Sequence, residues 1–130
     1  MNADECDDVE SDSVTAQIIG CAFTVANTLG IGFLEKVCEN ALAHEMRKRG
    51  LTVEQQRTIV VRYDNIIVGE YTADLVVNNH IIVELKVVKA IGDQHVAQCL
   101  NYLRATSKTL CLLMNFGRPR IEIRRVLTNF

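Results

Sequence analysis

The feature that most constrains this chain is the alternation of residues on either side of residues 78–80. Successive side chains of a β-strand point to opposite faces of its sheet, so the length of a hairpin loop decides which residues share a face. If residues 78–80 form a three-residue loop, Asp74 lies opposite Glu84, and Lys86 lies further along the same face. A two-residue loop would put the two carboxylates on opposite faces. The favoured register also gives the other face a continuous apolar surface, made of Ala73, Leu75, Val77, Ile81, Val83, Leu85 and Val87.

Two carboxylates directly opposite each other on paired strands repel unless something neutralises them. One of them could take up a proton at a raised pKa, or a divalent cation could bind between them. Oxygen ligands of this kind suit Mg²⁺ or Mn²⁺. The ammonium of Lys86 could orient a water and stabilise charge on a phosphoryl group, which completes the minimum for metal-assisted phosphodiester hydrolysis. The alternative is a structural ion pair, in which Lys86 only neutralises Asp74 and Glu84.

A helix predicted over about residues 33–49 could bring a third acid. On a helical projection Glu35 falls at the boundary of the apolar face that should pack on the sheet. A carboxylate in that place is costly unless it has a partner, so Glu35 is a candidate for the same site. An edge residue whose charge reaches water is the alternative, and Glu39, one turn later, is nearly as well placed.

A further helix, predicted over about residues 92–105, carries Gln98 and Tyr102 on one face, away from its apolar stripe. That face points either into the site or into water. The residues alone favour water, because the polar faces of amphipathic helices are usually solvated.

The remaining segments complete one α/β domain in which helices cover a mostly antiparallel or mixed sheet. Helical spacing predicts a first helix from an N-cap at Ser13 to about Leu29. Turn signals separate the β-branched runs, giving the order α-α-β-β-β-β-α-β-β. The expected strands are residues 58–63, 66–71, 72–77, 81–88, 110–116 and 121–127.

Composition and charge narrow the class of protein. Six of the sixteen acidic residues precede residue 13, so we expect an acidic disordered tail over residues 1–12. The remaining 118 residues carry 14 basic and 10 acidic side chains, which is compatible with a polyanionic partner. There is no apolar run of about 18 residues and no sign of a secretory signal, so we expect a cytoplasmic protein without a membrane span.

The cysteines argue against a zinc site or a disulfide scaffold. They are five in number, widely spaced, and include no Cys-x-x-Cys pair. Four of them lie in apolar stretches, where a free cysteine usually behaves as a small core residue. These are Cys21, Cys38, Cys99 and Cys111.

Four segments together resemble the GxxExxY proteins, a group placed within the PD-(D/E)XK nuclease superfamily. The similarity covers about residues 14–127, although Cys38 stands where the family name calls for tyrosine. The resemblance implies a single restriction-endonuclease-like domain over residues 13–130, with a mixed central sheet flanked by helices. The segments that carry it are residues 32–42, 69–75, 83–86 and 98–106.

The resemblance also implies roles for the candidate residues. Glu35 corresponds to the acid of the core helix, Asp74 to the aspartate of the motif, and Glu84 and Lys86 to its Glu-x-Lys. The backbone carbonyl of Leu85 would help Glu35, Asp74 and Glu84 to hold the metal. The segment from Gln98 to Tyr102 resembles the Gln-hydrophobic-x-x-Tyr element of RecB-like nucleases, which adds both residues to the catalytic set.

The function expected from these features is a Mg²⁺- or Mn²⁺-dependent nuclease that hydrolyses phosphodiester bonds in DNA, and a homodimer could help it to grip a duplex. The first alternative is a nucleic-acid-binding or regulatory module that keeps the fold without turnover. Basic residues such as Arg104, Arg118 and Arg120 would then contact phosphates. A second alternative is a protein-interaction domain whose charged residues only hold the hairpin together.

Overall fold

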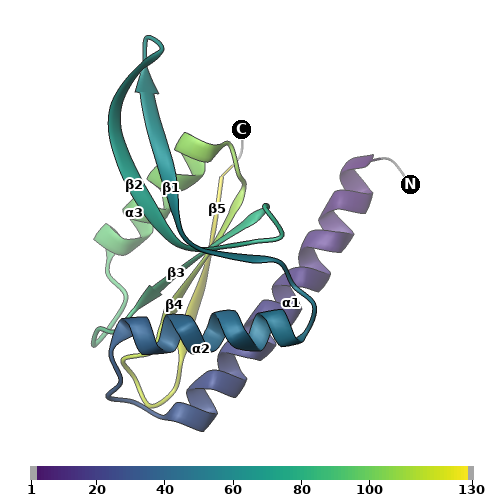
Figure 1. Cartoon of the computed structure of the whole chain (residues 1–130), viewed down its shortest axis with the longest axis vertical. Coiled ribbons are helices and arrows are strands. Elements are labelled where there is room, and N and C mark those ends of the chain that lie inside the picture. Colours follow the sequence, from purple (N-terminus) through teal and green to yellow (C-terminus); the bar gives the residue numbers. More distant parts are fainter. Residues whose placement is uncertain (1–2, 129–130) are drawn as a thin grey trace.

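The computed structural model describes residues 3–128, with side chains from residue 12 onward. Three helices and five strands follow one another along the chain (Figure 1). The elements are α1 (Ala3–Leu29), α2 (Glu35–Lys48), β1 (Val53–Tyr63), β2 (Ile66–Val77), β3 (Ile81–Lys86), α3 (Asp93–Thr106), β4 (Leu110–Asn115) and β5 (Glu122–Leu127).

The strands form one mixed sheet in the order β1-β2-β3-β4-β5. Only β3 and β4 are parallel, and α3 makes the crossover between them. The other neighbouring pairs are antiparallel. The predicted class, an α/β domain with a mixed sheet and flanking helices, is confirmed.

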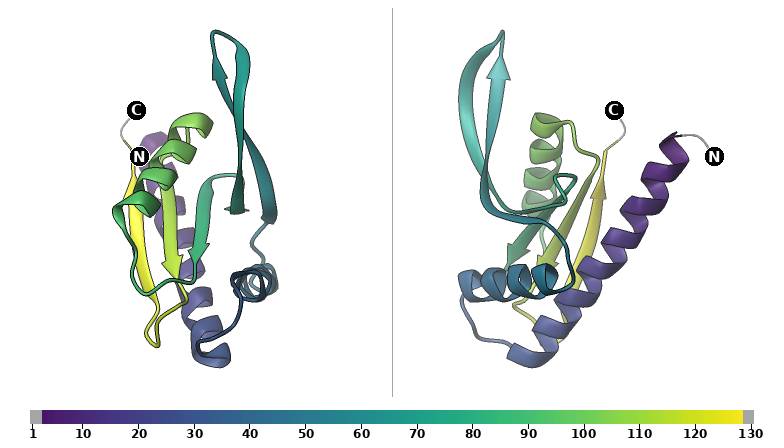
Figure 2. Two further views of the ribbon diagram at one scale, coloured as in Figure 1. Left: turned by 90° about the vertical axis from the view of Figure 1, so that its left-hand side faces the viewer. Right: turned by 45° about the vertical axis from the view of Figure 1, so that its right-hand side comes forward.

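Each face of the sheet packs against its own set of helices. Buried residues of α1 and α2, such as Ile18 and Leu42, share one apolar cluster with Val83 and Leu112. Buried residues of α3, such as Leu103, share a second cluster with alternate residues of the same strands. The views in Figure 2 show the sheet between α3 on one side and the α1–α2 pair on the other. The site described below therefore lies at the edge of a well-packed three-layer core.

Two predicted boundaries are wrong. The helix α1 begins at Ala3 and not after an N-cap at Ser13. Acidic residues are favoured near a helix N-terminus because the helix dipole attracts negative charge there. The predicted strands 66–71 and 72–77 are one strand, β2, so three strands and not four precede α3.

Glycines end the first two helices, as their positions in the sequence indicate. Gly30 and Gly50 both have a left-handed φ, of 73° and 86°. Glycine adopts this conformation without the steric penalty that a side chain would bring. The end of α1 at Leu29 and the end of α2 near Arg49 therefore agree with the sequence.

The hairpin of β1 and β2 projects well beyond the rest of the molecule (Figures 1 and 2). Its tip is a tight turn in which Asp64 and Asn65 both have positive φ. The projecting half of β2 is largely exposed, whereas residues 73–77 of the same strand are mostly buried in the body. One strand thus belongs partly to the core and partly to an exposed arm.

The four cysteines expected in the core are buried and free. Cys6 lies outside the residues whose side chains the structure describes. Over residues 3–128, no helix has the length and apolar character needed to cross a membrane.

Candidate active site

The β2–β3 hairpin has the predicted register. Its three backbone pairs end at Leu75 opposite Val83, so the next residues along the two strands are Asp74 and Glu84. There the strands separate, and side chains replace the backbone ladder. The backbone N–H of Asp74 donates to Glu84 Oε1 at 2.9 Å, and the N–H of Leu85 donates to Asp74 Oδ2 at 2.9 Å. Each carboxylate is therefore fixed by the backbone of the opposite strand.

The carboxyl group of Glu84 lies in an environment that opposes its ionisation. Its side chain is only 2% exposed. Burial, followed by the negative charge of Asp74, raises the pKa of Glu84 to about 9, although the N–H bond from Asp74 and the charge of Lys86 act the other way. Without a cation, Glu84 therefore keeps its proton at neutral pH. Of the two ways to relieve the repulsion, a divalent cation is the one that would let both groups ionise.

Lys86 does not act as an ion-pair partner for these acids. Its Nζ donates to Gln98 Oε1 at 3.1 Å. Among the described side chains, no carboxylate oxygen lies within 4.0 Å of Nζ. The alternative of a structural ion pair is therefore not supported, and the ammonium group is held beside the acids by an amide.

The face of α3 that carries Gln98 points toward the hairpin and not into water. Gln98 Nε2 donates to the hydroxyl of Tyr102 at 2.9 Å. Tyr102 is buried, and burial raises its pKa, so its hydroxyl stays neutral. The ring also packs against that of Tyr71, with centroids 5.4 Å apart. A continuous chain of contacts thus links Lys86 to α3 and on to β2.

Glu35, the first residue of α2, lies at the open edge of the same site. Its side chain is exposed, but partial burial and then the charge of Asp74 raise the pKa of Glu35, while Lys86 opposes the shift. The charges of the hairpin residues Asp74 and Lys86 therefore act on the carboxyl group of Glu35. The helix begins here because Gly32 has a left-handed φ of 100° and Leu34 is extended, which leaves Glu35 in the first turn.

Sequence reasoning missed Gln56, which links α2 to the hairpin. Glu39 is the buried acid of α2, and its oxygens accept hydrogen bonds from Lys36, Gln55 and Gln56 at 2.6 to 2.9 Å. Gln56 Nε2 also lies 3.3 Å from Asp74 Oδ1. It reaches both carboxylates because its φ of 55° is left-handed. No sequence signal marks a glutamine in that conformation, since asparagine and glycine are the residues that usually adopt it.

The donor set fits a hard divalent cation held by few protein ligands. No cluster of three or more His, Cys, Asp or Glu side chains that could hold a metal ion is present in the described part of the chain. Mg²⁺, however, is commonly bound through one or two carboxylates and keeps several waters. Asp74 and Glu84 would supply that pair, since each carboxylate is held by a backbone N–H of the opposite strand.

Comparisons with known proteins agree with this geometry. A family model described as the PD-(D/E)XK nuclease superfamily matches residues 12–126, nearly the whole chain. Searches of curated proteins and of solved structures found no match. The narrower resemblance to the GxxExxY proteins is not tested by this match and stays a prediction. By its sequence over residues 12–126, the chain belongs to the PD-(D/E)XK nuclease superfamily.

Proposed function

We propose that this protein is a nuclease that uses Mg²⁺ or Mn²⁺ to hydrolyse phosphodiester bonds in DNA. The observation that carries the proposal is the interlocked pair of Asp74 and Glu84, with an ammonium group beside it that is not paired with either acid. In a structural salt bridge, the ammonium group of Lys86 would be bound to a carboxylate. Here it is left available for a phosphoryl oxygen or a water.

Asp74 and Glu84 would hold the cation, together with the backbone carbonyl of Leu85 and with Glu35 as a further ligand or general base. A bound cation would polarise the phosphoryl group and lower the pKa of a coordinated water. Burial and the charge of Asp74 raise the pKa of Glu35, which makes its carboxylate a stronger base for a proton from water.

Lys86 would position the attacking water and stabilise the negative charge that develops on the phosphoryl oxygens. Gln98 accepts a hydrogen bond from the ammonium group and restricts the positions that it adopts. Tyr102 in turn holds Gln98, which leaves the three side chains oriented before substrate binds.

The test is a cleavage assay on single- and double-stranded DNA with Mg²⁺ and with Mn²⁺. We expect Lys86→Ala and Asp74→Asn each to lower the cleavage rate by at least about a hundredfold, the size of effect seen when one group that stabilises a transition state is lost. Asparagine keeps an acceptor for the N–H of Leu85, so the thermal transition should move little. Lys48→Ala, which removes the same charge at the exposed end of α2, is the control.

Two outcomes would contradict the proposal. If Lys86→Ala or Asp74→Asn cleaves at the rate of the unmodified protein, the roles given above are wrong. If the unmodified protein binds DNA in a salt-dependent manner but gives no products with Mn²⁺, the chain is a nucleic-acid-binding module that keeps the fold without turnover. A cytoplasmic location and a homodimer stay predictions of the sequence.

A further inference from the structure

A cleft of about 550 Å³ lies between α3 and the β1–β2 arm. This volume is within the range of small-molecule binding sites. No function described so far uses this cleft. Its walls are Val60, Val61, Arg62 and Tyr71 from the arm, and Asn101, Arg104 and Ala105 from α3.

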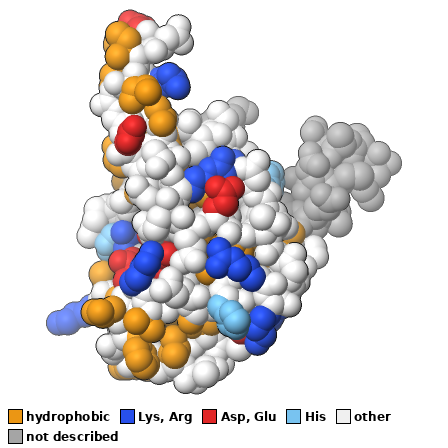
Figure 3. All heavy atoms as spheres, in the orientation of Figure 1, with side chains coloured by type: hydrophobic (Ala, Val, Ile, Leu, Met, Phe, Trp, Pro, Cys, Tyr) orange, Lys and Arg blue, Asp and Glu red, His pale blue; other side chains and the backbone are white. Residues whose placement is uncertain are grey.

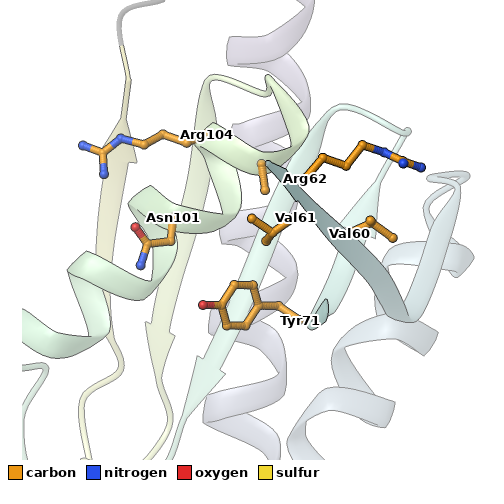
Figure 4. A pocket seen from close by; sticks show the side chains of 7 residues that line it. Val60, Val61, Arg62, Tyr71, Asn101 and Arg104 are labelled. Atoms are coloured by element: carbon orange, nitrogen blue, oxygen red, sulfur yellow. The ribbon is translucent and has the colours of Figure 1, made fainter. Parts of the chain in front are cut away.

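The middle and the flanks of the cleft differ in chemistry. Figure 4 shows Val61 and Tyr71 in the space between the arm and α3, with Asn101 extending from α3. The guanidinium groups of Arg62 and Arg104 extend away on opposite sides. Among the described residues, neither guanidinium has a carboxylate partner within 4.0 Å. The cleft therefore has an apolar and aromatic centre between two cations that are free to bind anions.

Tyr71 connects this cleft to the candidate active site. Its side chain is 45% exposed, while its ring packs at 52° against Tyr102, whose hydroxyl accepts the hydrogen bond from Gln98. Tyr71 also precedes Asp74 by three positions on β2, which corresponds to about 10 Å along the strand. A stacked strand rises about 3.4 Å per nucleotide and an unstacked strand rises more, so this separation spans at most about three nucleotides.

We propose that the cleft binds an unpaired nucleotide of the DNA substrate, two or three positions from the phosphate that is cleaved. The base would stack on Tyr71, with the amide of Asn101 at its edge. The guanidinium groups of Arg62 and Arg104 would contact the phosphates on either side. This inference rests on the proposed function, which it extends by naming a single-stranded segment or overhang as the substrate.

Stacking on Tyr71 favours an unpaired nucleotide over a base pair. Inside a duplex both faces of each base are already covered by neighbouring bases, whereas a single strand offers its bases to aromatic side chains. Two arginines on opposite sides of one aromatic ring also match the alternation of base and phosphate along a single strand.

Fluorescence anisotropy can test the proposal by measuring binding to a labelled 12-nucleotide single-stranded DNA and to the matching blunt duplex. EDTA is present throughout, so that no metal-dependent cleavage takes place. Tyr71→Leu keeps apolar bulk against Tyr102 but removes the aromatic face. The double variant Arg62→Gln/Arg104→Gln removes the two cations. Lys48→Gln is the control, because Lys48 is an exposed cation at the end of α2 and does not line the cleft.

We expect Tyr71→Leu to weaken single-strand binding roughly tenfold, in line with the effect of losing one stacked base. The double arginine variant should weaken it similarly and make the salt dependence shallower by about 1 to 1.5 in the log–log slope. Lys48→Gln should bind as the unmodified protein does, and Tyr71→Leu should leave duplex binding nearly unchanged.

Single-strand binding by both cleft variants at the level of the Lys48→Gln control would overturn the inference, even if cleavage depends on Asp74. An equal loss of duplex binding in Tyr71→Leu would overturn the assignment to an unpaired nucleotide. In the reverse case, cleft-dependent binding without any metal-dependent cleavage would support the cleft and contradict the nuclease.

Discussion

Burial and the negative charge of Asp74 both oppose the ionisation of the Glu84 carboxyl group. It is enclosed between β2 and α3, next to the carboxylate of Asp74, and its pKa rises to about 9. An acid with a raised pKa in the folded state binds its proton more tightly there than in the unfolded chain. Without a cation, the fold therefore becomes less stable as this proton is lost.

The free energy of unfolding should show this effect. For Glu84 the contribution is fully present below the unfolded pKa of about 4.5 and is lost as pH rises toward about 9, by up to about 1.4 kcal/mol per pH unit. Glu84→Gln removes the titrating group but keeps an acceptor for the N–H of Asp74. Urea unfolding of both proteins in EDTA at several pH values should give a steeper decline for the unmodified chain, whereas parallel curves would show that Glu84 is not protonated.

At the scale of single elements, the β2–β3 hairpin could be predicted in detail because the period of a strand is two. A slip of one residue would have put Asp74 and Glu84 on opposite faces, and the apolar pattern excludes that slip. The division of β2 into two strands was wrong for a related reason. The residues of β2 change from mostly buried to mostly exposed where the strand leaves the core for the arm. This change in residue types looks like the end of one strand and the start of another.

Other parts of the site depend on contacts that no local pattern contains. Gln56 reaches Glu39 and Asp74 only through a left-handed φ in the middle of β1. The sequence placed Glu35 and Glu39 on one helix edge as near equals. The structure buries Glu39 among amide and ammonium donors and leaves Glu35 exposed at the edge of the site. Which acid becomes buried is decided by the position of β1 and not by the helix itself.

The segment after β3, which holds Lys86 in place, requires a glycine at position 117. A Cβ atom there would lie 2.5 Å from the backbone N and O of Val88. We expect Gly117→Ala to lower the free energy of unfolding by about 1 to 3 kcal/mol, because backbone must move to admit the methyl group. Gly69→Ala is the control, since a Cβ atom at Gly69 meets nothing within 4 Å. Urea unfolding that shows equal effects for the two variants would contradict this account.

At the scale of the whole molecule, apolar side chains gather where the sheet is least protected. Figure 3 shows hydrophobic side chains over the projecting arm and over a second area at the lower end of the same face, with charged side chains between them. On the arm, Tyr63, Ile66 and Val68 are 60 to 71% exposed. Exposed apolar surface of this kind usually marks an interaction site, and β1 also has an open edge.

We expect a second copy of the chain to cover this arm, because antiparallel pairing of two β1 edges about a two-fold axis would bury both arms at once. The molecular mass in solution, measured by light scattering after size exclusion, should then be that of a dimer at micromolar concentration. Tyr63→Ser/Ile66→Ser should shift it toward the monomer. Leu127→Ser, an equally exposed apolar residue on β5, should not. A monomer at every concentration would contradict the expected dimer.

The central claim is that Asp74 and Glu84 hold a divalent cation, and calorimetric titration with Mn²⁺ and Mg²⁺ tests it most directly. The unmodified protein should bind a single cation per chain and release a proton from Glu84, seen as a heat that depends on the buffer. Asp74→Asn should weaken binding by at least about tenfold, while Asp64→Asn, an equal change of charge at the tip of the arm, should not. Equal affinity in Asp74→Asn and the unmodified protein, or no binding to the unmodified protein, would contradict the claim.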